Sequence, residues 1–140
     1  MGEVASEQVK QVEEQAFEFG AGLYGFPGVK RFLVVDLPGG GDLFKQMIAV
    51  EDPEVAFTIV FPFAFFPQYS PDIPEDALAE VGAENPEQIL LYVMAAVPAN
   101  FKESTANLRA PLIFNPFTRK ARQVILADDR LSTRERLFKA

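Results

Sequence analysis

The sequence has 140 residues, of which 49% are hydrophobic and 24% are charged, a composition typical of a one-domain globular protein. It contains neither cysteine nor histidine, which excludes disulfides, thiolate nucleophiles, Cys/His zinc sites and histidine general bases. Thirteen basic and twenty acidic residues give a net charge of −7, which argues against nucleic-acid binding and favours a basic protein partner.

The N-terminal segment is polar and acidic, and it has no apolar stretch of the kind that secretory signals carry. We expect residues 1–14 to form a mobile arm or a short helix and residues 15–140 to form a single domain. The longest apolar run, at 89–97, is well short of the ~18 residues that indicate a membrane helix. The lack of cysteine gives no sign of an oxidising compartment, so the expected location is the cytoplasm.

The first half of the chain predicts four strands. Residues 16–20 alternate apolar and polar, which is typical of a half-buried strand. The apolar runs 31–37 and 43–50 are separated by PGGGD, which predicts a hairpin. Those three glycines serve turn geometry, because a phosphate loop would need a lysine and a hydroxyl that lead into a helix. A further strand is predicted at 56–61.

The middle of the chain is interrupted by prolines. Four of them lie within residues 62–82, which excludes a long regular element there. Residues 74–82 predict a short helix with acids in its first turn and Gly82 as its stop signal. A single helical turn is predicted at 85–88. The run 89–98 is expected to be the most buried strand.

The C-terminal part predicts a second hairpin. Its strands are 107–114 and 121–127, and Asn115 with Pro116 suits the first two positions of a type I turn. Because Pro111 cannot donate to a ladder, the strand 107–114 is expected at a sheet edge or with a bulge. The tail 128–140 is expected to be irregular or weakly helical. The elements together predict a mostly β protein, a small antiparallel barrel or sandwich with one or two short helices.

Catalysis is the weaker class of function for this sequence. The acidic pairs Glu51-Asp52 and Asp128-Asp129 consist of adjacent residues, which point to opposite faces of a strand and form no convergent dyad. No spacing suits a calcium loop. A carboxylate-dependent hydrolase or a small-ligand-binding β-barrel nevertheless remains the alternative. A deep polar pocket with two converging acids would favour it.

The segment FPFAFFPQY (61–69) carries five aromatic residues among prolines, and it is expected at the sheet edge. Phe61 and Phe65 are expected in the core. Some of the other aromatic side chains are expected to be exposed, as anchors of a protein interface. The candidate protein-binding residues are Phe63, Phe66, Tyr69, Asp72, Asn107 and Arg109.

The segment STANLRAPLIFN (104–115) allows two interpretations. Ser104, Thr105 and Asn107 can hydrogen-bond nearby backbone groups and shape the turn into the next strand, which makes the segment a structural edge. Alternatively, the edge is available to another chain. We expect Asn107 to be structural and to hold the turn.

Four motifs together resemble the bacterial flagellar assembly factor FliW family: GLYGFPGVKRFLV, VEDPEVAFTIVFPFAFFPQY, TANLRAPLIFN and RQVIL. The resemblance covers about residues 15–138 and includes an Asn-Leu-x-Ala-Pro pattern at 107–111. The matching positions are Gly25, Phe26, Pro27, Asp52, Pro53, Pro62, Pro67, Tyr69, Thr105, Asn107, Leu108, Ala110 and Pro111.

The resemblance implies a non-enzymatic cytoplasmic regulator with a small β-barrel-like fold and no cofactor. Members of the family bind newly made flagellin. When flagellin has been exported, the freed factor binds the RNA-binding translational regulator CsrA and relieves its repression of flagellin mRNA. The implied partners are therefore flagellin and CsrA, with no direct nucleic-acid binding and no membrane. The acidic composition is consistent with a basic partner.

Overall fold

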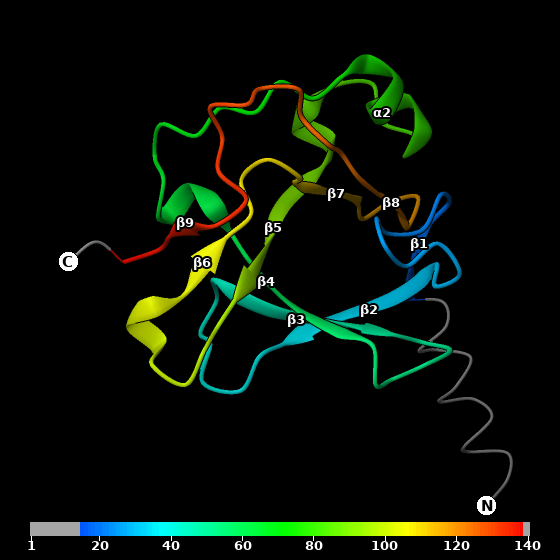
Figure 1. The fold of residues 1–140 in the computed structure, drawn as a ribbon. Coiled ribbons are helices and arrows are strands. Elements are labelled where there is room, and N and C mark those ends of the chain that lie inside the picture. Colours follow the sequence, from blue (N-terminus) through cyan, green and yellow to red (C-terminus); the bar gives the residue numbers. More distant parts are fainter. Residues whose placement is uncertain (1–14, 139–140) are drawn as a thin grey trace, which may run out of the picture.

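The strands close into a barrel in the computed structural model, which describes residues 15–138 (Figure 1). Seven strands form the ring in the order β4-β3-β2-β1-β8-β7-β5, and β5 pairs back with β4. The short strands β6 and β9 extend the sheet beyond one end of β5. The bounds are β1 Phe17–Phe19, β2 Arg31–Asp36, β3 Phe44–Ala49, β4 Ala56–Val60, β5 Leu90–Ala96, β6 Thr105–Ala106, β7 Leu112–Asn115, β8 Lys120–Gln123 and β9 Glu135–Arg136. The predicted mostly β, barrel-like fold is confirmed.

Both predicted hairpins are present. β2 pairs with β3 antiparallel across the glycine loop, with Phe32 opposite Ala49, and β7 pairs with β8, with Asn115 opposite Lys120. One pairing departs from the antiparallel expectation, because β1 runs parallel to β8 where the ring closes. Strand order along the chain does not reveal this contact, since it joins the first strand to one of the last.

The helices are short. α2 spans Glu75–Glu80 and ends before Gly82, whose φ of 76° lies in the left-handed region that glycine adopts readily. Three single turns of 3-10 helix lie in the described residues, and each begins at a proline or directly after an asparagine. The one at Pro86–Gln88 confirms the predicted turn. The other two are η1 (Pro62–Ala64) and η3 (Phe101–Glu103).

Two layers of apolar side chains result from the alternation along the strands. Phe19, Phe32 and Phe114 belong to the cluster that fills the barrel interior, to which the strands around most of the ring contribute. The outward side chains, among them Ile113, form a second cluster. α2, the loops after β4 and the C-terminal segment cover this outer layer (Figure 1).

The most buried strand is β7, so the expectation that 89–98 would be the most buried strand was wrong. All four residues of β7 are buried, whereas β5 alternates and Leu90 is 49% exposed. The reason is position: β7 has its inner face in the barrel interior and its outer face under the second layer. The ends of β5 extend past that cover.

The expectation of one strand over 107–114, at a sheet edge or with a bulge, was also wrong: residues 107–111 form a turn, and β7 after it pairs with strands on both sides. Pro111 lies just before β7, outside the β5 ladder that would have needed its N–H, and its carbonyl accepts a hydrogen bond from Val124 N–H at 2.8 Å. The C-terminal segment runs along the outer side of 104–115, where Leu108 N–H donates to Ser132 O at 3.0 Å. Part of the tail is thus a strand, β9, paired with β6, rather than irregular or helical.

The expectation for residues 1–14 lies outside the described residues. Within residues 15–138, none of the helices has the length and apolar character needed to cross a membrane.

Candidate functional site

The aromatic segment 61–69 leaves the barrel instead of forming its edge. β4 is flanked by β3 on one side and β5 on the other, and the chain turns away at η1 directly after it. The N–H groups of Phe65 and Phe66 donate to the carbonyl of Pro62, at 3.1 and 2.8 Å. The prolines are therefore tolerated because they stand beyond the ladder, and the expected sheet-edge position was wrong.

The burial of the aromatic side chains differs from the expectation. Phe61 was expected in the core, but it is 37% exposed, because it follows the last residue of β4 at the mouth of the barrel. Its ring contacts Phe63, with ring centroids 5.3 Å apart. Phe65 packs partly buried against Phe44, and Phe63 and Phe66 are half-buried at the rim of the outer layer.

Tyr69 is buried, so it is not among the aromatic side chains of the segment that reach the surface. Only 8% of it is accessible, and its hydroxyl donates a hydrogen bond of 2.6 Å to the carbonyl of Leu108. Burial raises the pKa of Tyr69, because the phenolate would lose its hydration. Its hydrogen bond joins the 61–74 segment to the 104–115 segment and so holds the two segments in place at the surface.

Tyr69→Phe should lower the free energy of unfolding by about 1–3 kcal/mol near neutral pH, because the buried carbonyl of Leu108 loses its donor. The raised pKa means that the tyrosine ionises at lower pH in the unfolded chain than in the folded one. Ionisation favours the unfolded chain above about pH 10, so wild type loses stability there relative to the variant. Urea denaturation should show a smaller difference in free energy of unfolding between wild type and Tyr69→Phe at about pH 10.5 than at about pH 8. A pH-independent difference would contradict the burial argument.

Asn107 holds its turn as expected. Its side-chain oxygen accepts hydrogen bonds from the N–H groups of Arg109 and Ala110, at 3.1 and 3.2 Å. Its own N–H donates to Met94 O at 2.9 Å. The guanidinium of Arg109 donates from Nε to the carbonyl of Leu126 at 3.4 Å. These two candidates therefore brace the chain between β6 and β7.

Asp72 lines a large hollow, of about 890 Å³, which lies between residues 68–74 and 125–131. Asp128 lines the same hollow, but Arg130 binds it at 2.9 Å, and this hydrogen bond lowers the pKa of Asp128 below its usual value. A carboxylate held ionised in this way is a poor general acid. Asp128 is thus poorly suited to donate a proton in catalysis.

The six candidate residues are only partly brought together. Tyr69 and Asp72 line the large hollow, and Phe63 with Tyr69 lines a neighbouring one. Asn107 faces a separate hollow of about 420 Å³ with Thr58, Thr105 and Arg134 among its lining residues. Within residues 15–138, no group of three or more acidic side chains is placed to hold a metal ion.

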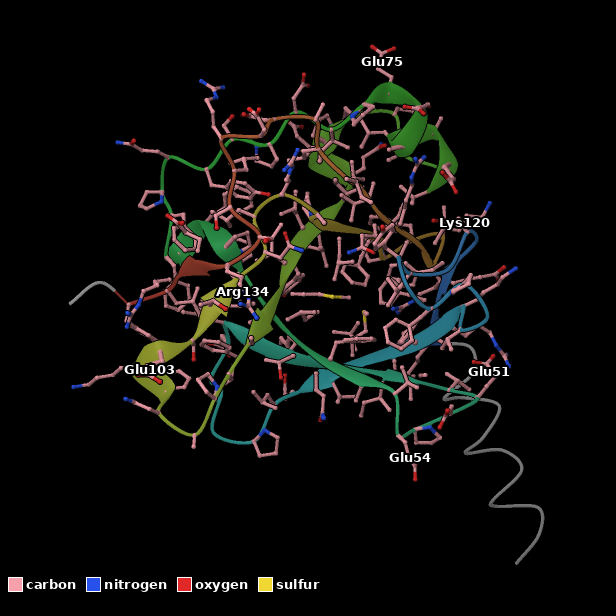
Figure 2. The ribbon with its side chains drawn as sticks, in the orientation of Figure 1. Glu51, Glu54, Glu75, Glu103, Lys120 and Arg134 are labelled. Atoms are coloured by element: carbon pink, nitrogen blue, oxygen red, sulfur yellow. The ribbon has the colours of Figure 1, made fainter. Side chains whose placement is uncertain are left out.

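Sequence reasoning missed a segregation of charge that a count by segment reveals. Residues 46–101 contain no lysine or arginine. Residues 102–140, by contrast, hold nine of the thirteen basic residues. Figure 2 shows Glu51 and Glu54 at the β3–β4 turn and Glu75 on α2, all directed outward. The acidic residues of the segment 46–101 are Glu51, Asp52, Glu54, Asp72, Glu75, Asp76, Glu80, Glu84 and Glu87.

Comparisons with known proteins agree with the fold and the motifs. The family model described as FliW protein matches residues 3–137. A flagellar assembly factor FliW of Symbiobacterium thermophilum is 66% identical over 125 residues, which are 89% of this chain and 91% of that protein. One of Syntrophomonas wolfei is 39% identical and covers 90% of this chain and 80% of its own. A crystal structure of the flagellar assembly factor FliW matches with a TM-score of 0.85 and 31% identity, over 91% of this chain and 89% of that one.

Proposed function

Because the chain belongs to the FliW family of flagellar assembly factors, we propose that it is a non-enzymatic regulator that binds flagellin in the cytoplasm. When flagellin has been exported, the freed protein binds the translational regulator CsrA and antagonises it, which relieves repression of flagellin mRNA. The amount of this protein that is not bound to flagellin thereby sets how much flagellin mRNA is translated.

The observation that carries this proposal is the uneven charge on a FliW-type fold. The segment 46–101 supplies nine carboxylates and no cation, and it spans β4, α2 and β5. Two of these carboxylates, Glu51 and Glu80, form ion pairs with Arg31 and Arg122. A protein that binds RNA presents a basic surface to the phosphates, because those contacts dominate its affinity. The acidic segment suits such a surface, and its charge accelerates encounter more than it strengthens the final complex.

The same charge explains how the protein would act without touching RNA. Bound to CsrA, its carboxylates would neutralise or face the cations that hold phosphate, and they would repel an approaching RNA backbone. A non-enzymatic role is supported by two features of the site. The barrel interior is a packed core of side chains such as Phe19, Phe32 and Met47, and Asp128 is held in an ion pair.

A gel-shift assay with flagellin leader RNA tests this proposal. This chain alone should give no complex, since its net charge of −7 opposes the phosphates. Added to a preformed complex of CsrA and RNA, it should release the RNA in proportion to its concentration. Purified flagellin, added last, should withdraw the protein and restore the complex. Direct tight binding of RNA by this chain, or RNA that stays on CsrA when the protein is in excess, would contradict the proposal.

A further inference from the structure

Three neighbouring hollows of the surface are joined by shared residues. The large hollow and a second one of about 350 Å³ both include Tyr69, Ser70 and Pro71 in their walls. The large hollow and a third one of about 410 Å³ both include Ile125. The hollows therefore adjoin one another, and together we call them the apolar groove. It is defined by Tyr24, Ile125, Tyr69, Pro71, Phe61 and Leu90.

The apolar groove exposes large apolar side chains along its whole length. Tyr24 is 81% exposed at one end, Ile125 is 59% exposed in the middle, and Leu90 is 49% exposed at the other end. Apolar side chains scattered singly on a surface are ordinary, but several of them in adjoining hollows mark an interaction site.

The walls of the groove are held in place by hydrogen bonds from distant parts of the sequence. Tyr24 N–H donates to the side-chain oxygen of Gln123 at 2.9 Å, which fixes the loop at one end. Leu126 N–H donates to Arg109 O at 2.8 Å. Tyr69 is tied to Leu108 at the centre. Figure 1 shows the loop after η1 and the C-terminal segment after β8 passing over the same side of the barrel. A fixed groove binds with a small loss of conformational entropy.

Among the charged side chains that line the groove, one carboxylate has no ion pair within the described residues. Arg122 is paired with Glu80, and Arg130 is paired with Asp128. The hollow at the Leu90 end has no charged residue in its wall. Asp72 has no ion pair with any residue of the described part of the chain. A matching ligand is thus apolar over most of its length and carries a cation where it meets Asp72.

We propose that the apolar groove docks an amphipathic segment of a partner protein, with apolar side chains laid against Tyr24, Ile125 and Leu90 and a lysine or arginine set against Asp72. The proposal rests on the proposed function in that it assigns this surface to partner binding, but its chemistry is independent of which partner is bound. An amphipathic helix presents such a row at positions i, i+3, i+4 and i+7.

The first test uses two helical peptides of about 18 residues with the same leucine face, one with lysines and the other with glutamates on the polar face. The lysine peptide should bind the full chain, and the resulting NMR shift changes should map to residues 23–27, 69–72, 89–92 and 125–131. The glutamate peptide should bind at least about tenfold more weakly. Shift changes centred elsewhere would overturn the proposal, as would equal binding of both peptides.

Matched variants separate the groove from general electrostatic attraction. Ile125→Asn and Asp72→Asn should each weaken the lysine peptide by about tenfold, the effect of losing a central contact. Val97→Asn and Glu54→Gln make the same chemical changes outside the groove, at a 39% exposed valine and at the β3–β4 turn seen in Figure 2. These controls should alter binding less than about twofold. Equal losses in the groove variants and the controls would overturn the proposal.

The same four variants are then titrated with purified flagellin and purified CsrA. Weaker binding of either protein by the two groove variants alone supports the groove as its docking site. Suppose that wild type binds flagellin and CsrA, and that the groove variants bind both proteins and the peptide equally well. The groove proposal then fails, and the proposed function stands. If wild type binds neither protein, the proposed function fails, and the peptide experiment still decides the groove.

Discussion

Replacing Phe114 by alanine should lower the free energy of unfolding by about 3–5 kcal/mol, among the largest losses expected for one side chain. Phe114 is 2% exposed at the centre of the barrel interior. Its ring makes edge-to-face contacts with Phe17 and Phe19, at centroid distances of 5.1 and 5.7 Å, and with Tyr92 at 6.1 Å. The substitution leaves a cavity that the closed ring of strands cannot collapse to fill.

Urea or guanidinium denaturation measures this loss, and the chain supplies a matched control three residues away. Phe117 lies in the turn between β7 and β8 and is 87% exposed. Phe117→Ala should change stability by less than about 0.5 kcal/mol, because it removes almost no buried contact. If the two variants lose similar amounts, the barrel interior is not the main source of stability, and the assignment of layers fails.

Asn115→Ala should cost about 2–4 kcal/mol, because one buried side chain makes three hydrogen bonds. Its Nδ2 donates to the carbonyl of Val81 at 2.9 Å, and its Oδ1 accepts from the N–H groups of Phe117 and Thr118, at 3.0 and 3.4 Å. Asn115 is 2% exposed, so water cannot replace these partners freely. It therefore closes the hairpin turn and ties that turn to the end of α2.

Asn85→Ala is the matched control for this prediction. The side chain of Asn85 accepts one hydrogen bond, from Glu87 N–H at 3.0 Å, at an exposed position, so its loss should cost less than about 1 kcal/mol. Hydrogen exchange adds a local measurement. The amides of α2 should exchange faster in Asn115→Ala than the overall loss of stability requires, because the helix loses its tie to the turn. Unchanged protection of α2 would contradict the role given to Asn115.

The two apolar layers have different roles. The barrel interior holds the strands in register, and the outer layer positions the loops that form the apolar groove. Tyr69 shows the connection, since it belongs to the outer layer and lines two hollows of the groove. Variants of the interior should therefore change stability, whereas variants of the groove surface, such as Ile125→Asn, should change binding with little effect on the melting temperature.

Local signals in the sequence determined the elements. Alternation predicted β1, the glycine loop predicted the β2–β3 hairpin, and Asn115 with Pro116 predicted the β7–β8 turn. The acids of the first turn and Gly82 predicted α2. Each of these features depends on residues within a few positions of one another, so the sequence alone carries the physical cause. The motifs that resemble the FliW family could also be identified in the sequence, because each lies in or beside one of the strands.

Only the tertiary structure decided which strand is central and which aromatic residue is buried. Pro111 suggested an edge, but β8 and the C-terminal segment come from further along the chain to cover 104–115. Phe61 was expected in the core but is 37% exposed after the end of β4, and Tyr69 is buried because its hydroxyl reaches Leu108. The apolar groove likewise combines residues 24, 69–72, 90 and 125. Periodicity shows which side of a strand is apolar, but what packs against that side depends on pairings across long sequence separations, and these follow from closure of the barrel.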